Sequence, residues 1–121
     1  MASSSAYKRK LSGSTDGKPI KVVQTATAGD TIHTAVAGTT AGTFDEVWLW
    51  AYNGHTSDVV LTVEFGGASV PDQNIVVTIP FKSGLIPVVP GLILQNGMVV
   101  KAFAGTANVV TLMGYVNAIV D

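Results

Sequence analysis

From Pro19 onward the chain alternates apolar and polar residues in short runs, which Gly, Asn, Asp and Pro separate. Neighbouring residues of a strand point to opposite faces, so this period of two is typical of strands with one buried face. The pattern predicts eight strands, at residues 20–25, 31–37, 44–53, 58–65, 74–81, 85–94, 98–104 and 109–120. Strands of this number and spacing, with no helical pattern, favour a single all-β domain at residues 19–121, an antiparallel sandwich or jelly roll.

The same alternation predicts which side chains form the core. In the strand at 58–65 every second residue from Val59 is apolar, whereas Val60, Thr62 and Glu64 are predicted to face outward. Across all strands, the predicted core comprises Val47, Leu49, Leu61, Val63, Val77, Ile79, Val100 and Leu112.

Turn chemistry predicts two hairpins. Asn96-Gly97 supplies the two positive-φ residues of a type I′ turn, which would pair Leu94 with Val99. Residues 53–57 predict a second, longer hairpin between the strands on either side.

Two prolines decide how residues 85–94 are interpreted. This window is the most apolar of the chain, but it is short and contains Pro87 and Pro90, so we expect no membrane span. Each proline lacks a backbone donor, and the strand is therefore expected at a sheet edge or a bend.

The strand at 44–53 has two faces that both favour burial. Val47, Leu49 and Ala51 form an aliphatic face, and Phe44, Trp48, Trp50 and Tyr52 form an aromatic one. Only one face of a sandwich strand lies in the core, so the aromatic face needs another cover. Loops of the same chain, a protein partner and a stacked sugar all remain open, and Trp48, Trp50 and Tyr52 are the candidate partner-binding residues.

The first 18 residues are rich in Ser, Gly and charge and have no hydrophobic period, so we expect a flexible N-terminal arm at 1–18. Five of the seven Lys and Arg residues lie in the first 21 positions, and Lys8, Arg9 and Lys10 are consecutive. A cluster without interleaved aromatic residues favours a solvated tail or a protein-docking arm over nucleic-acid binding. These three residues are the second set of candidate partner-binding residues.

Composition strengthens the expectation of assembly. Only 12% of the residues are charged and 47% are hydrophobic, which leaves much of the surface tolerant of burial against a partner. The chain has no cysteine, which excludes disulfides and thiolate sites. No apolar run follows the first basic residues as in a secretory signal, so we expect synthesis and assembly in a cytoplasm.

No pattern of catalytic or metal-binding residues is recognisable. His33 is expected to be a hydrogen-bonded surface or interface residue, and His55 a turn residue. Asp45 and Glu46 point to opposite strand faces, cannot share a proton, and are expected to be solubility or edge charges. The sequence therefore predicts a protein that is not an enzyme and has no metal or cofactor.

Three segments carry a resemblance to known proteins: residues 31–35, the strand at 47–53, and residues 90–97 with the following 99–102. Together with the lack of cysteine and the basic arm, they make residues 30–121 resemble small virion proteins of tailed bacteriophages. The closest likeness is to capsid decoration (cement) proteins, and it transfers no individual site residue.

This resemblance implies a structural protein of the virion that binds the outer capsid lattice and stabilises it. It further implies the major capsid protein or another virion protein as partner, and a homo-oligomer, commonly a trimer at quasi-threefold positions. Two other classes stay open: a head-to-tail connector, tail or fibre component, and a carbohydrate- or receptor-binding module that uses the aromatic strip.

Overall fold

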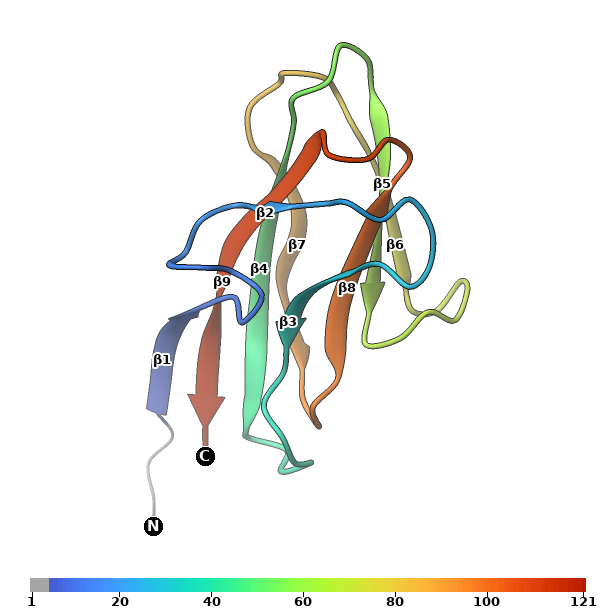
Figure 1. The fold of residues 1–121 in the computed structure, drawn as a ribbon. Helices are drawn as coiled ribbons and strands as arrows, with labels where there is room; N and C mark the ends of the chain where they lie inside the picture. Colours follow the sequence, from blue (N-terminus) through green and yellow to red (C-terminus); the bar gives the residue numbers. More distant parts are fainter. Residues whose placement is uncertain (1–4) are drawn as a thin grey trace.

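The computed structural model describes residues 5–121, which form nine strands in two antiparallel sheets (Figure 1). Sheet A contains β1 (Ser5–Lys10), β2 (Ile20–Lys21), β4 (Phe44–Asn53), β7 (Ile86–Leu94) and β9 (Val110–Val120). Sheet B contains β3 (Asp30–Thr34), β5 (Val59–Phe65), β6 (Asn74–Ile79) and β8 (Val99–Ala104). No helix occurs in this part of the chain, and the predicted all-β sandwich is confirmed.

The strand order is that of a jelly roll. Sheet A runs β1-β9-β4-β7, with β2 also on β9, and sheet B runs β3-β8-β5-β6. Strands counted from the two ends of the chain therefore pair with each other: β1 and β2 with β9, β3 with β8, β4 with β7, and β5 with β6. A long hairpin that is rolled into two layers has this connectivity.

Both predicted hairpins are wrong, although the turn chemistry at one of them is right. Asn96 and Gly97 have φ angles of 63° and 66°, as expected, but they connect β7 in sheet A to β8 in sheet B. Leu94 therefore pairs with Asp45 of β4, and Val99 lies in the other sheet. The connection from β4 to β5 crosses between the sheets in the same way.

The N-terminal segment lies against the body more closely than its sequence indicates. Ser5–Lys10 pairs with β9 along its whole length, and Leu11 is only 1% exposed in the core. The predicted arm at 1–18 therefore differs from the structure over residues 5–18, and residues 1–4 lie outside the described residues. All six side chains of β1 are exposed, so no hydrophobic period marks a strand that is held by backbone pairing.

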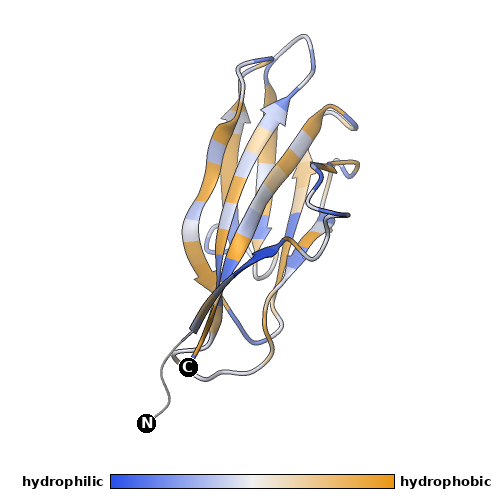
Figure 2. Ribbon diagram, turned by 90° about the vertical axis from the view of Figure 1, so that its left-hand side faces the viewer, coloured by the Kyte–Doolittle hydropathy of each residue, from blue (hydrophilic) through white to orange (hydrophobic). Residues whose placement is uncertain are grey.

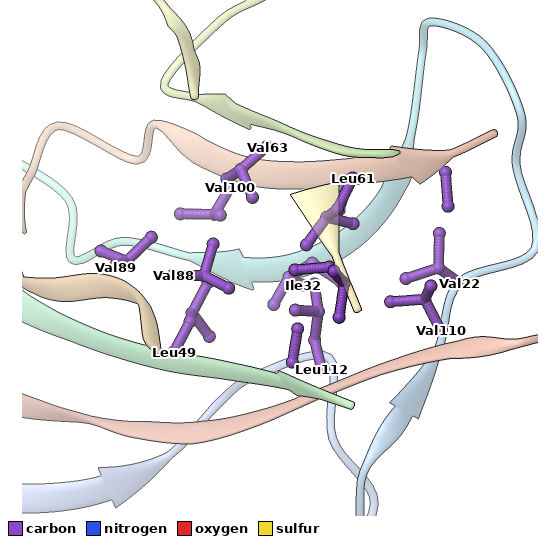
Figure 3. Packing of buried hydrophobic residues seen from close by; sticks show 14 of the residues in the cluster. Val22, Ile32, Leu49, Leu61, Val63, Val88, Val89, Val100, Val110 and Leu112 are labelled. Atoms are coloured by element: carbon purple, nitrogen blue, oxygen red, sulfur yellow. The ribbon is translucent and has the colours of Figure 1, made fainter. Parts of the chain in front are cut away.

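The core lies between the two sheets, and hydrophobic residues alternate with polar ones along the strands that enclose it (Figures 2 and 3). The predicted core residues Val47, Leu49, Leu61, Val63, Ile79, Val100 and Leu112 are at most 1% exposed. Val77, also predicted, is partly buried and packs against this cluster. The edge position predicted for residues 85–94 is confirmed, because β7 ends sheet A.

Candidate functional site

The outer face of sheet A is aromatic along β4. Trp48, Trp50 and Tyr52 are partly exposed, and the residues between them are almost completely buried. The two-faced strand predicted from the sequence is confirmed. Because the aliphatic face fills the core, the rings must lie on the outside of the sandwich.

β9 adds a ring that the site prediction omitted. Tyr115 lies directly across from Trp48 in the ladder between β4 and β9. Its ring centroid is 6.4 Å from that of Trp48 and 6.0 Å from that of Trp50, and the two tryptophan centroids are 6.3 Å apart. The three planes lie within 17° to 31° of one another. The alternation of β9 places Tyr115 on its outer side, but only the register joins it to the tryptophans.

A glycine on the neighbouring strand fixes the orientation of Trp48. A Cβ at Gly91 would lie 2.6 Å from Cζ2 of this indole, and 2.9 and 3.1 Å from Cε2 and Cη2, the two atoms bonded to it. These similar distances mean that the six-membered ring rests with its face on the backbone of β7. Trp50 and Tyr115 are near-parallel to it, so the aromatic platform, defined as Trp48, Trp50 and Tyr115, follows the sheet surface.

A carboxylate lies at one border of the aromatic platform. Glu46 Oε1 accepts a hydrogen bond from Nδ2 of Asn117 at 3.1 Å and from Nε1 of Trp48 at 2.7 Å. These two bonds, that from Asn117 first, lower the pKa of Glu46 from its ordinary value, against a smaller opposite effect of burial. Glu46 is therefore ionised near neutral pH and holds the polar edge of the indole in place.

The predicted basic cluster divides between two faces. Lys8 lies on the outer face, with Nζ 4.5 Å from the centroid of the Tyr115 ring. Arg9 points to the other side of β1, where its guanidinium carbon is 5.8 Å from the centroid of Tyr7. Lys10 donates from Nζ to the carbonyl oxygen of Ser14 at 3.1 Å. Only Lys8 therefore contacts the aromatic platform directly.

Tyr52, the remaining predicted site residue, lies at the far end of β4 from Glu46. It pairs with Thr111 of β9, the residue that also pairs with Lys21 of β2. Among the described residues, Tyr52 does not stack on Trp48, Trp50 or Tyr115. Together with Lys21, it extends the outer face beyond the aromatic platform.

His33 and Asp45 form a buried pair. His33 is hydrogen-bonded as predicted, but it is not a surface or interface residue of this chain, and Asp45 is not a solubility or edge charge. They are 4% and 6% exposed, and His33 Nε2 lies 2.7 Å from Asp45 Oδ2. His33 Nδ1 accepts from the backbone N–H of Ser12 at 3.0 Å, so the ring proton is on Nε2 and is donated to Asp45. Both ring nitrogens are engaged: Nδ1 attaches the segment after β1 to β3, and Nε2 connects β3 to β4 of the other sheet.

Glu64 is a second buried carboxylate that the alternation placed in solvent. It is on the outer face of sheet B as predicted, yet it is only 3% exposed. It accepts hydrogen bonds from the Thr27 hydroxyl and from the Gly29 backbone N–H, the latter at 2.7 Å. The connection between β2 and β3 therefore covers this part of the sheet.

Further comparisons supply no family for the chain. No protein-family model, no curated protein and no solved structure matches it. Among residues 5–121, no three His, Cys, Asp or Glu side chains come together as metal ligands, and no helix is able to cross a membrane. The aromatic platform and its charged border combine partly exposed rings with a carboxylate and an ammonium group on one sheet face.

Proposed function

We propose that this protein is a structural virion protein that binds the outer capsid lattice and stabilises it. The observation that carries the proposal is the aromatic platform, three neighbouring rings whose planes lie within 31° of one another and that remain partly exposed on a sheet face. Large rings at the centre of a surface patch are typical of residues that dominate protein binding. The jelly roll also occurs in viral capsid proteins, which is support at the level of fold alone.

The mechanism is mass action. A protein that buries surface on the assembled shell, and not on free shell subunits, shifts the equilibrium toward the shell. The rings provide the desolvated centre of such a contact, while Lys8 and Lys21 at its border favour an acidic patch on the shell. A trimer, as the resemblance implies, would multiply the effect because its contacts act together.

Co-sedimentation with empty shells of the same virus tests the proposal. Trp50→Ala should weaken shell binding by about 10- to 30-fold, the usual effect of removing a central aromatic anchor. Val60→Ala is the matched control, because Val60 is 46% exposed on sheet B and lies away from the platform. Equal binding by wild type and Trp50→Ala would contradict the proposal.

The basic strand makes a separate contribution that salt should reveal. Replacing Lys8, Arg9 and Lys10 together by Ala should lower shell affinity and flatten its dependence on salt, because exposed charges are screened. The melting temperature should change little, since all three side chains are exposed. An unchanged salt dependence would exclude β1 from the contact.

A carbohydrate-binding module is the second candidate, and one observation favours it. The ring of Trp48 lies flat on the sheet, and the ionised carboxylate of Glu46 lies beside it as a hydrogen-bond acceptor. A flat ring with a polar neighbour suits the face of a sugar. Glycan-array binding that is lost in Trp50→Ala, with shell binding absent in wild type, would favour this function over the first.

A further inference from the structure

The two sheets of the sandwich have four edge strands, and an exposed edge can pair with a strand of another molecule. Sheet A ends in β1 and β7, and sheet B ends in β3 and β6. Natural proteins obstruct such edges with charge, proline, irregular register or a covering segment. Three of the four edges here carry one of these features.

The edge of β3 is covered by the segment that follows β1. The backbone N–H of Gly13 donates to the carbonyl oxygen of Ile32 at 2.9 Å. The backbone N–H of Thr34 donates to the hydroxyl of Ser12 at 2.7 Å. Edge groups of β3 are thus already used within the chain.

The two edges of sheet A are obstructed by other means. β7 contains Pro87 and Pro90, each without a backbone donor, and its register with β4 is irregular at two points. β1 carries Lys8, Arg9 and Lys10 in succession, so pairing with another copy of itself would bring like charges together. Neither edge is suited to a second copy of this chain.

β6 has none of these obstructions. Its sequence, Asn-Ile-Val-Val-Thr-Ile, contains no charge and no proline, and its register with β5 is regular. Its side chains include Val76, which is 62% exposed. Six uncharged residues of high β-propensity at an open edge are typical of a site for strand addition.

The ladder defines which backbone groups of β6 are free. Phe65 N–H donates to Gln73 O at 2.8 Å, so Gln73 and every second residue after it direct their backbone groups toward β5. Asn74, Val76 and Thr78 consequently direct theirs to the open side. Among the described residues, no backbone group donates to or accepts from these three on that side.

We propose that β6 pairs antiparallel with β6 of a second copy, about a twofold axis at Val76. In this register all the free backbone groups of Asn74, Val76 and Thr78 are used, because Asn74 of each copy pairs with Thr78 of the other. The two Val76 side chains then pack across the axis, and no like charges meet. A twofold contact of this kind uses the same residues on both copies.

The register also places a donor near a polar group that lacks a partner. Among the described residues, Oδ1 of Asn74 is a buried side-chain atom without a hydrogen bond. The Thr78 hydroxyl of the second copy lies across from Asn74 and can serve an amide turned toward the edge. An Asn74 amide that rotates toward the edge would thus gain a partner that the single chain does not supply.

This contact is independent of the proposed function. It joins the two copies of sheet B into one sheet, while the aromatic platform on the outer face of sheet A stays accessible. A threefold contact made elsewhere on the surface is compatible with it. Loss of shell binding would therefore leave the β6 contact intact, and loss of the β6 contact would leave the platform intact.

Light scattering on a size-exclusion column provides the first test. Wild type should contain an even number of chains, and Val76→Lys should reduce the mass by half, because two ammonium groups would meet at the axis. Val60→Lys is the control: Val60 is exposed on the same sheet face but lies on β5, away from the axis, and its mass should equal that of wild type. Both variants replace an exposed valine, and a cooperative thermal unfolding transition in each establishes that both are folded. Wild type that is monomeric throughout a dilution series, or an unchanged mass in Val76→Lys, would overturn the proposal.

Charge complementation and cross-linking test the axis itself. Val76→Glu alone should also halve the mass, and an equal mixture with Val76→Lys should restore it. Val76 would form a hydrogen-bonded pair with its copy, in which the Cα atoms lie about 5.5 Å apart. Because the chain has no cysteine, Val76→Cys should give a covalent dimer with a short bismaleimide cross-linker, and Val60→Cys should not. Equal cross-linking of the two variants, or a mixture that stays at the lower mass, would contradict a twofold axis at Val76.

Discussion

Leu61 is the position at which the packing of the sandwich is tested most directly. It is completely buried and points from β5 into the space between the sheets (Figure 3). Leu61→Ala removes three carbon atoms, and their transfer to water costs about 0.8 kcal/mol each. The unfilled cavity adds to this, so the free energy of unfolding should fall by about 3 to 5 kcal/mol.

Urea unfolding followed by tryptophan fluorescence measures this loss. The midpoint should move to lower urea with an unchanged slope, because the mutation alters stability and not the surface exposed on unfolding. Val60→Ala, next to it on the outer face, is 46% exposed and should cost less than about 0.5 kcal/mol. A loss below about 1 kcal/mol in Leu61→Ala, or equal losses in both variants, would refute the packing described here.

Three further perturbations follow from the site. Gly91→Ala should displace the Trp48 ring and destabilise the fold by about 1 to 3 kcal/mol, because the new Cβ would collide with the indole and because residue 91 has a φ of 76°. An unchanged near-ultraviolet circular dichroism spectrum would contradict this contact. Asp45→Ala should cost about 1 to 3 kcal/mol in urea unfolding, since it leaves the buried Nε2–H of His33 without an acceptor; Asp45→Asn keeps an acceptor, and an equal loss in both would argue against the bond. Protonation of Glu46 should alter tryptophan fluorescence below pH 4.5. The pKa of Glu46 is lowered in the folded protein, so the hydrogen bonds to its carboxylate are present above pH 4.5 and are lost as the pH falls through the folded-state pKa. The same titration in Glu46→Gln would contradict the assignment.

The N-terminal segment and β9 show where sequence prediction reaches its limit. All side chains of β1 are exposed, so hydrophobic periodicity cannot detect a strand whose stability comes from backbone bonds to β9. Tyr115 has the alternation of an outward residue, but its distance to Trp48 depends on register. The contact between His33 and Asp45 joins residues of opposite sheets, which no local pattern specifies.

What the sequence by itself determined is local: the existence of most strands, which side of each is buried, and the positive φ at Asn96 and Gly97. These follow from side-chain alternation and from the steric limits of single residues, and neither depends on distant parts of the chain. Only the tertiary structure decided which sheet each strand joins, and therefore that the turn at Asn96 connects two sheets. Strand partners are selected by the packing of the whole core and by the satisfaction of edge hydrogen bonds. The aromatic platform, the covered Glu64 and the open edge of β6 therefore depend on the tertiary fold.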